Sequence, residues 1–281
     1  MARILHITDI HFGCENKAAV EAARQHAIEG GYDLIVQSGD MTMVGCEPEF
    51  RIASEWLKTL PQPRIDTPGN HDTPEFDVLA RAFQPWDLYS RYIGEPWGMG
   101  VLAEGVAAEA MNTSRGVQLR LNWSKGACRA EDARRVCANL SKAPPGALKV
   151  VVCHHPLLEV TGGPMTARVR GGEEAARIVA EGGADLVLTG HIHMPFAHPL
   201  PFGDGKTYAV GASTLSLRER GVPPGYNVII ADERQIHVTA MGWVGGKFEA
   251  QRSWGFDRRG APPAAASAPP EDEPLALAKS A

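Results

Sequence analysis

The sequence predicts an α/β protein in which two β-sheets pack together and helices cover their outer faces. Short apolar runs alternate with helical patterns from residue 3 to residue 82, which is the order that builds a parallel sheet. A second set of apolar runs starts at residue 106 and continues mainly as strands beyond residue 193. In addition, five apolar runs end in Asp, Asn or His, residue types that can hold a metal ion.

The composition fits a folded core followed by a short tail. The chain has 281 residues, a net charge of −5 and 44% hydrophobic residues, which suits one large α/β domain or two small ones. One domain over residues 1–257 is the simplest architecture. Residues 258–281 are rich in Pro and Ala and have few large apolar side chains, which predicts a disordered tail.

Charge and cysteine content bear on partners and location. The mildly acidic balance gives no general attraction to nucleic acid, so a nucleic-acid partner is not expected. No apolar run approaches transmembrane length, and no basic-then-apolar signal segment precedes the first strand, so membrane insertion is not expected. Five cysteines without a C-x-x-C pair indicate reduced thiols and predict a cytoplasmic location. A homo-oligomer is a further hypothesis.

Helices and strands alternate in the first part of the chain. The helix over residues 17–29 has Asn16 as its cap and Gly30 as its stop. Pro48 lies near the first turn of the next helix, whose apolar face includes Phe50 and Leu57. The expected order is strand 3–8, helix 17–29, strand 33–37, helix from Pro48, strand 64–66 and a helix near residues 75–82.

The second part of the chain changes character. Residues 94–105 are glycine-rich and are expected to be irregular, either as a cap over the site or as a long loop. The expected elements then are strands 106–112 and 117–123, helix 131–140, strand 148–153, helix 173–180 and strand 186–188. Beyond residue 193 we expect strands around Phe196 and over 207–210, 226–231, 236–241 and 248–254.

Five apolar runs end in polar residues that can act as ligands. They are RILHITDIH (Asp9, His11), YDLIVQSGD (Asp40), RIDTPGNHD (Asn70, His71, Asp72), ALKVVVCHHP (His154, His155) and ADLVLTGHIH (His191, His193). A single ending of this kind usually reflects only the preference of Asp and Gly for tight turns. Because the carboxyl ends of parallel strands meet at one edge of a sheet, five endings together predict a site.

The number of candidate ligands indicates two metal ions. A single catalytic metal usually takes about three protein ligands. Two ions about 3.5–4 Å apart that share a carboxylate would use the whole set. Mixed oxygen and nitrogen ligands fit manganese, iron or zinc, so the expected cofactors are two metal ions of these kinds.

In this order, the motifs D-x-H, G-D, G-N-H-D, H-H-P and G-H-x-H resemble the calcineurin-like metallophosphoesterase superfamily. The resemblance implies a four-layer α/β/β/α sandwich of two mixed β-sheets with a dinuclear site. It implies that Asp40 bridges the two ions. The ligands it implies are Asp9, His11, Asp40 and His193 for one ion, and Asp40, Asn70, His154 and His191 for the other.

The residues alone do not decide between His154 and His155, because alternation in a strand places them on opposite sides. The family pattern His-x-Pro makes His154 the ligand and gives His155 a supporting or structural role. His71 is expected to face the substrate, where its imidazolium would either stabilise the phosphorane-like oxygens or protonate the leaving group. Asp72 either orients His71 or caps the following helix.

The resemblance implies hydrolysis of a phosphate ester through attack by a metal-bridging hydroxide. The spacing and the segment GASTLSLRERGVPPGYNVI look most like the bacterial branch that includes cyclic-nucleotide and glycerophosphodiester phosphodiesterases. The expected partner is therefore a small phosphodiester. Alternatives are a phosphomonoesterase or a nucleotide-sugar/lipid pyrophosphatase. A missing Lys/Arg cluster argues against a nuclease, and a full ligand set argues against a non-catalytic scaffold.

Four residues are candidates for contact with the substrate. Arg218 and Arg220 can reach a second phosphate or a ribose hydroxyl, although solvated loop charges are the alternative. Phe12 is a candidate for an apolar wall, with core packing as the alternative. His155 is the fourth candidate.

Overall fold

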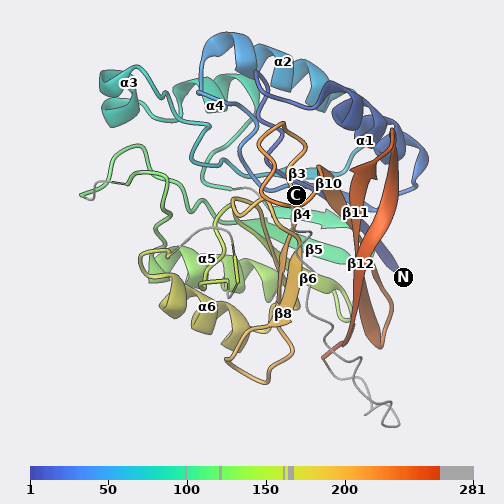
Figure 1. The fold of residues 1–281 in the computed structure, drawn as a ribbon. Coiled ribbons are helices and arrows are strands. Elements are labelled where there is room, and N and C mark those ends of the chain that lie inside the picture. The colour runs from blue at the N-terminus through green and yellow to red at the C-terminus, as the bar shows by residue number, and fades with distance from the viewer. Residues whose placement is uncertain (99, 120–121, 161, 164–167, 260–281) are drawn as a thin grey trace.

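The computed structural model describes residues 1–98, 100–119, 122–160, 162–163 and 168–259. Two six-stranded sheets pack face to face, and helices cover the outer face of each sheet (Figure 1). This arrangement confirms the expected four-layer α/β/β/α sandwich. Among the described residues, no helix is both long and apolar enough to cross a membrane.

The first sheet combines parallel and antiparallel pairs. Its order is β12 (Lys247–Asp257), β11 (Gln235–Val244), β10 (Gly225–Ala231), β1 (Ala2–Ile7), β2 (Leu34–Gln37) and β3 (Arg64–Asp66). Strands β1, β2 and β3 are parallel, whereas β10 to β12 pair antiparallel. Helices α1 (Lys17–Glu29) and α2 (Glu47–Lys58) connect the parallel strands. Asn16 caps α1, as expected, because its side chain accepts the Ala19 N–H at 3.2 Å.

The second sheet is also mixed. Its order is β4 (Gly100–Ala103), β5 (Val106–Ala110), β6 (Leu148–Val152), β7 (Leu186–Thr189), β9 (Tyr208–Gly211) and β8 (Phe196–Pro199). The four inner strands are parallel, and each edge strand is antiparallel to its neighbour. Helices α5 (Ala130–Leu140) and α6 (Gly172–Glu181) cover its outer face.

The core lies in three apolar layers because each inner strand is covered on both faces. In β1, Ile4 faces the second sheet, whereas Leu5 and Ile7 face α1 and α2. Val151 of β6 packs toward α5 and α6. Burying one such aliphatic side chain stabilises the fold by roughly 1.5–3 kcal/mol.

Two segments have a secondary structure that differs from the one predicted from the sequence. The helix expected near residues 75–82 is replaced by α3 (Val78–Phe83) and α4 (Asp87–Tyr92). Asp77 sets the start of α3, because its carboxylate accepts the Ala80 N–H at 2.9 Å. The irregular stretch at 94–105 contains β4, which pairs with β5 through a tight turn at Gly105 (φ 68°).

The strand expected over residues 117–123 is wrong for the residues that the structure describes there. Val117 and Leu119 are exposed, so their alternation does not cover a core. Residues 117–119 and 122–123 of this segment lie outside any helix or strand. The predicted tail lies almost wholly outside the described residues, and the domain boundary at residue 257 stays a prediction. Arg259 follows β12 and still forms an ion pair with Asp204 at 2.7 Å.

Candidate metal centre

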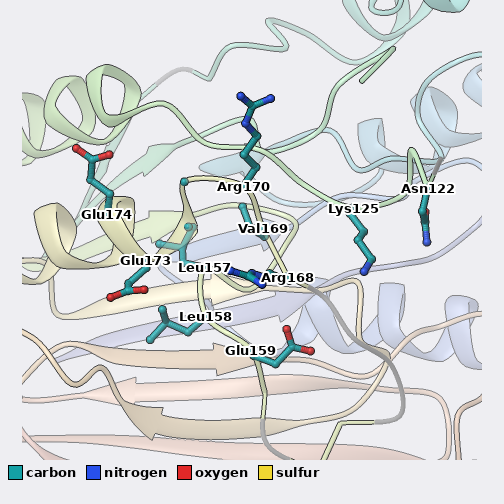
Figure 2. Close-up of a pocket in the computed structure, with 12 residues that line it drawn as sticks. Asn122, Lys125, Leu157, Leu158, Glu159, Arg168, Val169, Arg170, Glu173 and Glu174 are labelled. Atoms are coloured by element: carbon teal, nitrogen blue, oxygen red, sulfur yellow. The ribbon is translucent and has the colours of Figure 1, made fainter. Parts of the chain in front are cut away.

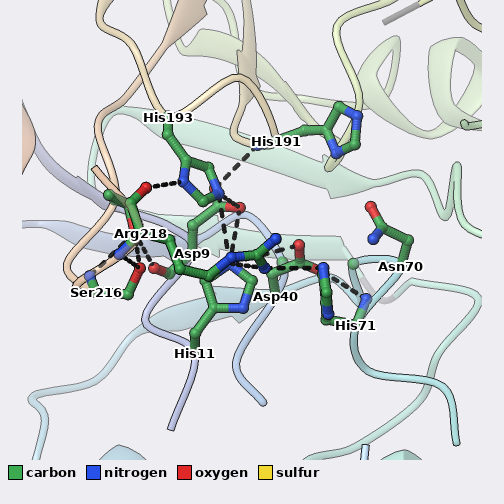
Figure 3. Close-up of polar contacts among 12 residues, drawn as sticks. Asp9, His11, Asp40, Asn70, His71, His191, His193, Ser216 and Arg218 are labelled. Atoms are coloured by element: carbon green, nitrogen blue, oxygen red, sulfur yellow. Dashed lines mark hydrogen bonds and ion pairs between the residues drawn. The ribbon is translucent and has the colours of Figure 1, made fainter. Parts of the chain in front are cut away.

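Five loops meet where parallel strands of the two sheets end (Figure 3). Strands β1, β2 and β3 of the first sheet and strands β6 and β7 of the second each carry one loop. Every predicted ligand is at most 5% exposed, so the set lies in a desolvated pocket: Asp9, His11, Asp40, Asn70, His154, His191 and His193. The topology thus brings together all seven residues that the sequence singled out as ligands.

One group of ligand atoms surrounds Asp9. The Oδ1 atom of Asp9 lies 3.0 Å from His193 Nε2 and 3.7 Å from His11 Nε2. The two imidazole nitrogens are 3.4 Å apart. Three potential ligand atoms therefore converge on one point that a cation can occupy.

Asp40 connects this group to a second one. Its Oδ2 atom lies 3.2 Å from His154 Nε2 and 3.8 Å from His11 Nε2. Its other oxygen accepts the backbone N–H of His71 at 2.8 Å. The free oxygen thus faces both groups, which is the position a shared carboxylate needs.

Several buried polar atoms at the centre have no hydrogen bond in the described part of the chain. They are Asp9 Oδ1, Asn70 Oδ1, His154 Nε2 and His191 Nε2. Leaving such atoms unsatisfied costs about 1–3 kcal/mol each, so each requires an explanation. These atoms are the ones a metal would bind, and the residues therefore fit a centre of metal ions.

Backbone carbonyl groups orient three of the histidines. The Nδ1–H groups of His11, His154 and His193 donate to carbonyls of Thr42 at 3.2 Å, Ser38 at 2.9 Å and Arg218 at 2.8 Å. A carbonyl can only accept, so each Nδ1 carries a proton and Nε2 is the nitrogen directed into the centre. Support of this kind is usual around histidine ligands of metals.

The backbone at the centre is held in an uncommon conformation. Asp9, His11, Asp40, His191 and His193 have φ between 51° and 67°. Within the described residues, these are all the non-glycine residues with positive φ. Such conformations persist at functional sites where the surrounding structure holds them.

This conformation explains how His191 and His193 separate. In an extended strand, residues one apart would point the same way. The left-handed turns direct His193 to Asp9 and His11, whereas His191 lies next to His154 with ring centroids 5.2 Å apart. Figure 3 shows the two rings turned away from each other.

The charges favour binding of cations. Burial raises the pKa of Asp9 and Asp40, but the neighbouring histidines outweigh burial and hold both values below the ordinary range. Burial lowers the pKa of His11 to about 4, so its imidazole is neutral. The carboxylates raise the pKa of His154 to about 9 against the effect of burial. A metal at this ring therefore has to displace a proton.

Gly190 lets the β7 loop approach the β1 loop closely. A Cβ atom at this position would overlap with the side chains of Thr8 and Asp9. The backbone N–H of His191 donates to Asp9 Oδ2 at 2.9 Å, which depends on this close approach.

We expect Gly190→Ala to weaken metal binding by about 10–100-fold, as for other changes that displace the support of a ligand. The measurement is titration of manganese into the metal-free protein. Gly255→Ala is the control, because its Cβ would come no closer than 3.6 Å to another atom. Unchanged affinity in Gly190→Ala would show that the close approach is not needed.

His71 borders the metal loops and contacts Arg218. Its Nδ1–H donates to the Met43 carbonyl at 2.6 Å, and its Nε2 lies 2.9 Å from the Arg218 guanidinium. The guanidinium can only donate, so Nε2 is the acceptor. The carbonyl of Arg218 also supports His193. Arg218 thereby contacts both His71 and His193, and its contact with the substrate stays a prediction. Arg220 lies nearby and donates to the His191 carbonyl at 3.5 Å.

Asp72 has a different role from either one expected of it. It does not orient His71, because the Met43 carbonyl occupies His71 Nδ1. It does not cap α3, because Asp77 does. Instead, its buried carboxylate accepts N–H groups of Met41 at 3.2 Å, Thr42 at 2.9 Å and Gly69 at 2.9 Å. Asp72 therefore ties the β2 loop to the β3 loop.

Two further sequence candidates lie away from any surface that a substrate can reach. His155 is fully buried, and its ring nitrogens contact Thr113 Oγ1 at 2.9 Å and the Ser124 carbonyl at 2.8 Å. This agrees with a supporting role and not with substrate binding. Phe12 is 3% exposed and packs edge-on against Trp56, so it belongs to the core.

Two of the cavities are lined by polar and charged residues. One, of about 280 Å³, is bordered by Asn70 and His71. The other, of about 780 Å³, lies at the start of α6 and has a lining of mixed charge that includes Lys125, Arg168 and Glu173 (Figure 2). The described lining of the larger cavity contains none of the predicted ligands. The smaller cavity reaches the centre, because the predicted ligand Asn70 is part of its lining.

The sequence interpretation missed Trp123 and Arg81, which line the smaller cavity. Trp123 fell inside a segment interpreted as a strand, and Arg81 inside a helix. A signal was present in the unusual Trp within an otherwise polar stretch, N-W-S-K-G.

Comparison with known proteins agrees with this geometry. A family model for calcineurin-like phosphoesterases matches residues 2–195. A protein of Synechococcus sp., described as a probable cyclic nucleotide phosphodiesterase, is 25% identical over 262 residues, which cover 86% of this chain and 92% of that protein.

Two solved structures share the fold. Purple acid phosphatase PPD1 of yellow lupin (Lupinus luteus) superposes with a TM-score of 0.64 and 11% identity, over 95% of this chain and 57% of that chain. This chain thus spans little more than half of the lupin enzyme. TT1561 of Thermus thermophilus gives a TM-score of 0.51 and 15% identity, over 89% and 98% of the two chains.

The family match extends over well more than half of the 281 residues and includes all five polar strand endings. The chain therefore belongs to the calcineurin-like phosphoesterase family.

Proposed function

We propose that this protein is a metal-dependent phosphodiesterase that hydrolyses small phosphodiesters. The observation that carries the proposal is the set of buried ligand atoms without hydrogen-bond partners at the meeting point of five strand ends. The similarity to the Synechococcus protein supports a diester substrate.

Two metal ions would divide the ligands between them. Asp9, His11, Asp40 and His193 would hold one, and Asp40, Asn70, His154 and His191 the other. When bound, such ions neutralise phosphoryl oxygens and make water a stronger nucleophile at neutral pH. Manganese, iron and zinc all suit this mixture of ligands, and elemental analysis of protein purified without chelator identifies the ions.

His71 and Arg218 act on the substrate itself. Arg218 turns from His71 Nε2, now 2.9 Å away, to a non-bridging phosphate oxygen when the substrate enters. His71 Nε2 then takes a proton from solvent and donates it to the departing ester oxygen as the P–O bond breaks. The Met43 carbonyl holds the imidazole in the required orientation throughout.

A comparison of two chromogenic substrates tests the proposal. With manganese added, we expect kcat/KM for bis-p-nitrophenyl phosphate to exceed that for p-nitrophenyl phosphate by at least about tenfold, or about 1.4 kcal/mol. Equal or faster hydrolysis of the monoester would favour a phosphomonoesterase. No hydrolysis of either substrate would contradict the proposal. A cytoplasmic location and self-association stay predictions.

A further inference from the structure

The cavity of about 280 Å³ beside Asn70 and His71 has walls from both halves of the fold. Its volume is just below the range of roughly 300–1,000 Å³ that is usual for small-molecule sites, so it has room for one ring system. The residues that form its walls are Asn70, His71, Thr73, Glu75 and Arg81 from the first half, and Trp123 and Ser124 from the loop before α5.

Arg81 fixes one side of Trp123. The centre of its guanidinium lies 5.6 Å from the centroid of the indole ring, in cation–π contact. The guanidinium donates to the carbonyls of Gly116 at 2.8 Å and Pro74 at 3.2 Å, and the residue is 8% exposed. Arg81 is therefore held over the ring.

The backbone that follows Trp123 contacts the loop after β6. The carbonyl of Ser124, the next residue in the chain, accepts the Nε2–H of His155 at 2.8 Å. His155 directly follows the predicted ligand His154 in the chain. The backbone next to Trp123 is thus tied to the segment that carries His154.

The charges of the cavity select for an uncharged ligand. Arg81 is engaged by two carbonyls and the indole face, so it is not directed at an anion. Glu75 is exposed at the rim and would repel a second phosphate. An aromatic wall next to a carboxylate suits a neutral planar ring, which would stack on the indole.

We propose that this cavity binds a planar ring carried by the leaving group of the substrate, such as an aryl ring or the base of a nucleoside, and that Trp123 determines this specificity. The inference rests on the proposed function, in which His71 protonates the leaving oxygen. Because His71 lines the same cavity, the departing group lies against Trp123. An alkyl leaving group cannot stack on the indole ring, so Trp123 would add nothing to its binding affinity.

Two phosphonates that are not hydrolysed test the inference on manganese-loaded protein by calorimetry. Benzylphosphonate and ethylphosphonate present the same anion to the centre and differ in the ring. We expect benzylphosphonate to bind about tenfold more tightly, in the range of stacking contacts. Trp123→Ala should remove this preference while ethylphosphonate binds as before, and Trp123→Phe should retain most of it.

Trp97→Ala is the matched control, because Trp97 is 51% exposed and also lies under an arginine, with Arg115 at 6.0 Å. It should retain the preference. If Trp123→Ala keeps the preference, or loses ethylphosphonate binding as well, Trp123 is structural and the inference is wrong. If ethylphosphonate fails to bind the unmodified protein, the proposed function itself is wrong, and this inference with it.

Discussion

Asp40→Asn is expected to remove both metals and to lower turnover by more than about 100-fold, the upper end for residues that only support a ligand. Asn tolerates the left-handed backbone at this position (φ 53°) and can still accept the His71 N–H. What changes is the oxygen that faces His154 at 3.2 Å and His11 at 3.8 Å. An amide there has no negative charge to share between two cations.

Elemental analysis and turnover of the same preparation measure this result. Asp185→Asn is the control, because Asp185 is 5% exposed and accepts the Lys149 N–H at 2.8 Å just before β7, at the end of that strand away from the metal loops. It should keep about two metals per chain. Loss of only one metal from Asp40→Asn would mean that Asp40 is not shared, and loss of none would contradict its role altogether.

His71→Ala is expected to lower kcat by about 10²–10⁴-fold for diesters with an alkyl leaving group, the usual range for a general acid. The metal content should stay at about two per chain. For esters of p-nitrophenol, kcat should fall much less, because p-nitrophenolate departs without a proton. The dependence on the leaving group distinguishes proton donation from a purely electrostatic effect.

His237→Ala serves as the control, since His237 is exposed on β11 far along the chain from the metal loops. It should leave both substrates unaffected. An equal loss on both classes of ester would indicate charge stabilisation by His71 in place of proton donation. Loss of metal from His71→Ala would make it a ligand, and unchanged turnover would remove it from the mechanism.

That the candidate ligands lie close together was predictable from the topology of parallel strands. Each parallel strand ends at the same edge of its sheet, so a polar residue directly after an apolar run has few other places to lie. His191 and His193 illustrate this rule. They follow directly after the apolar strand that begins at Leu186, and both lie at the centre. The fold followed from the same alternation of strands and helices.

Roles that depend on a partner distant in the chain were not predictable. Asp72 was expected to serve His71 or a helix, yet its acceptors are satisfied by the β2 loop some 30 residues away. Phe12 follows a metal loop but turns into the core against Trp56. In both cases the local sequence allowed several partners, and packing of separate segments selected one.

The sequence by itself determined which residue types reach the centre and in what order, since apolar periodicity fixes where each strand ends. Only the tertiary structure decided how they face one another. The left-handed turns at Asp9, Asp40 and His191 direct the candidate ligands, and Arg81 of α3 lies over the Trp123 ring. These features depend on long-range contacts, which stabilise backbone and side-chain conformations that no local propensity would favour.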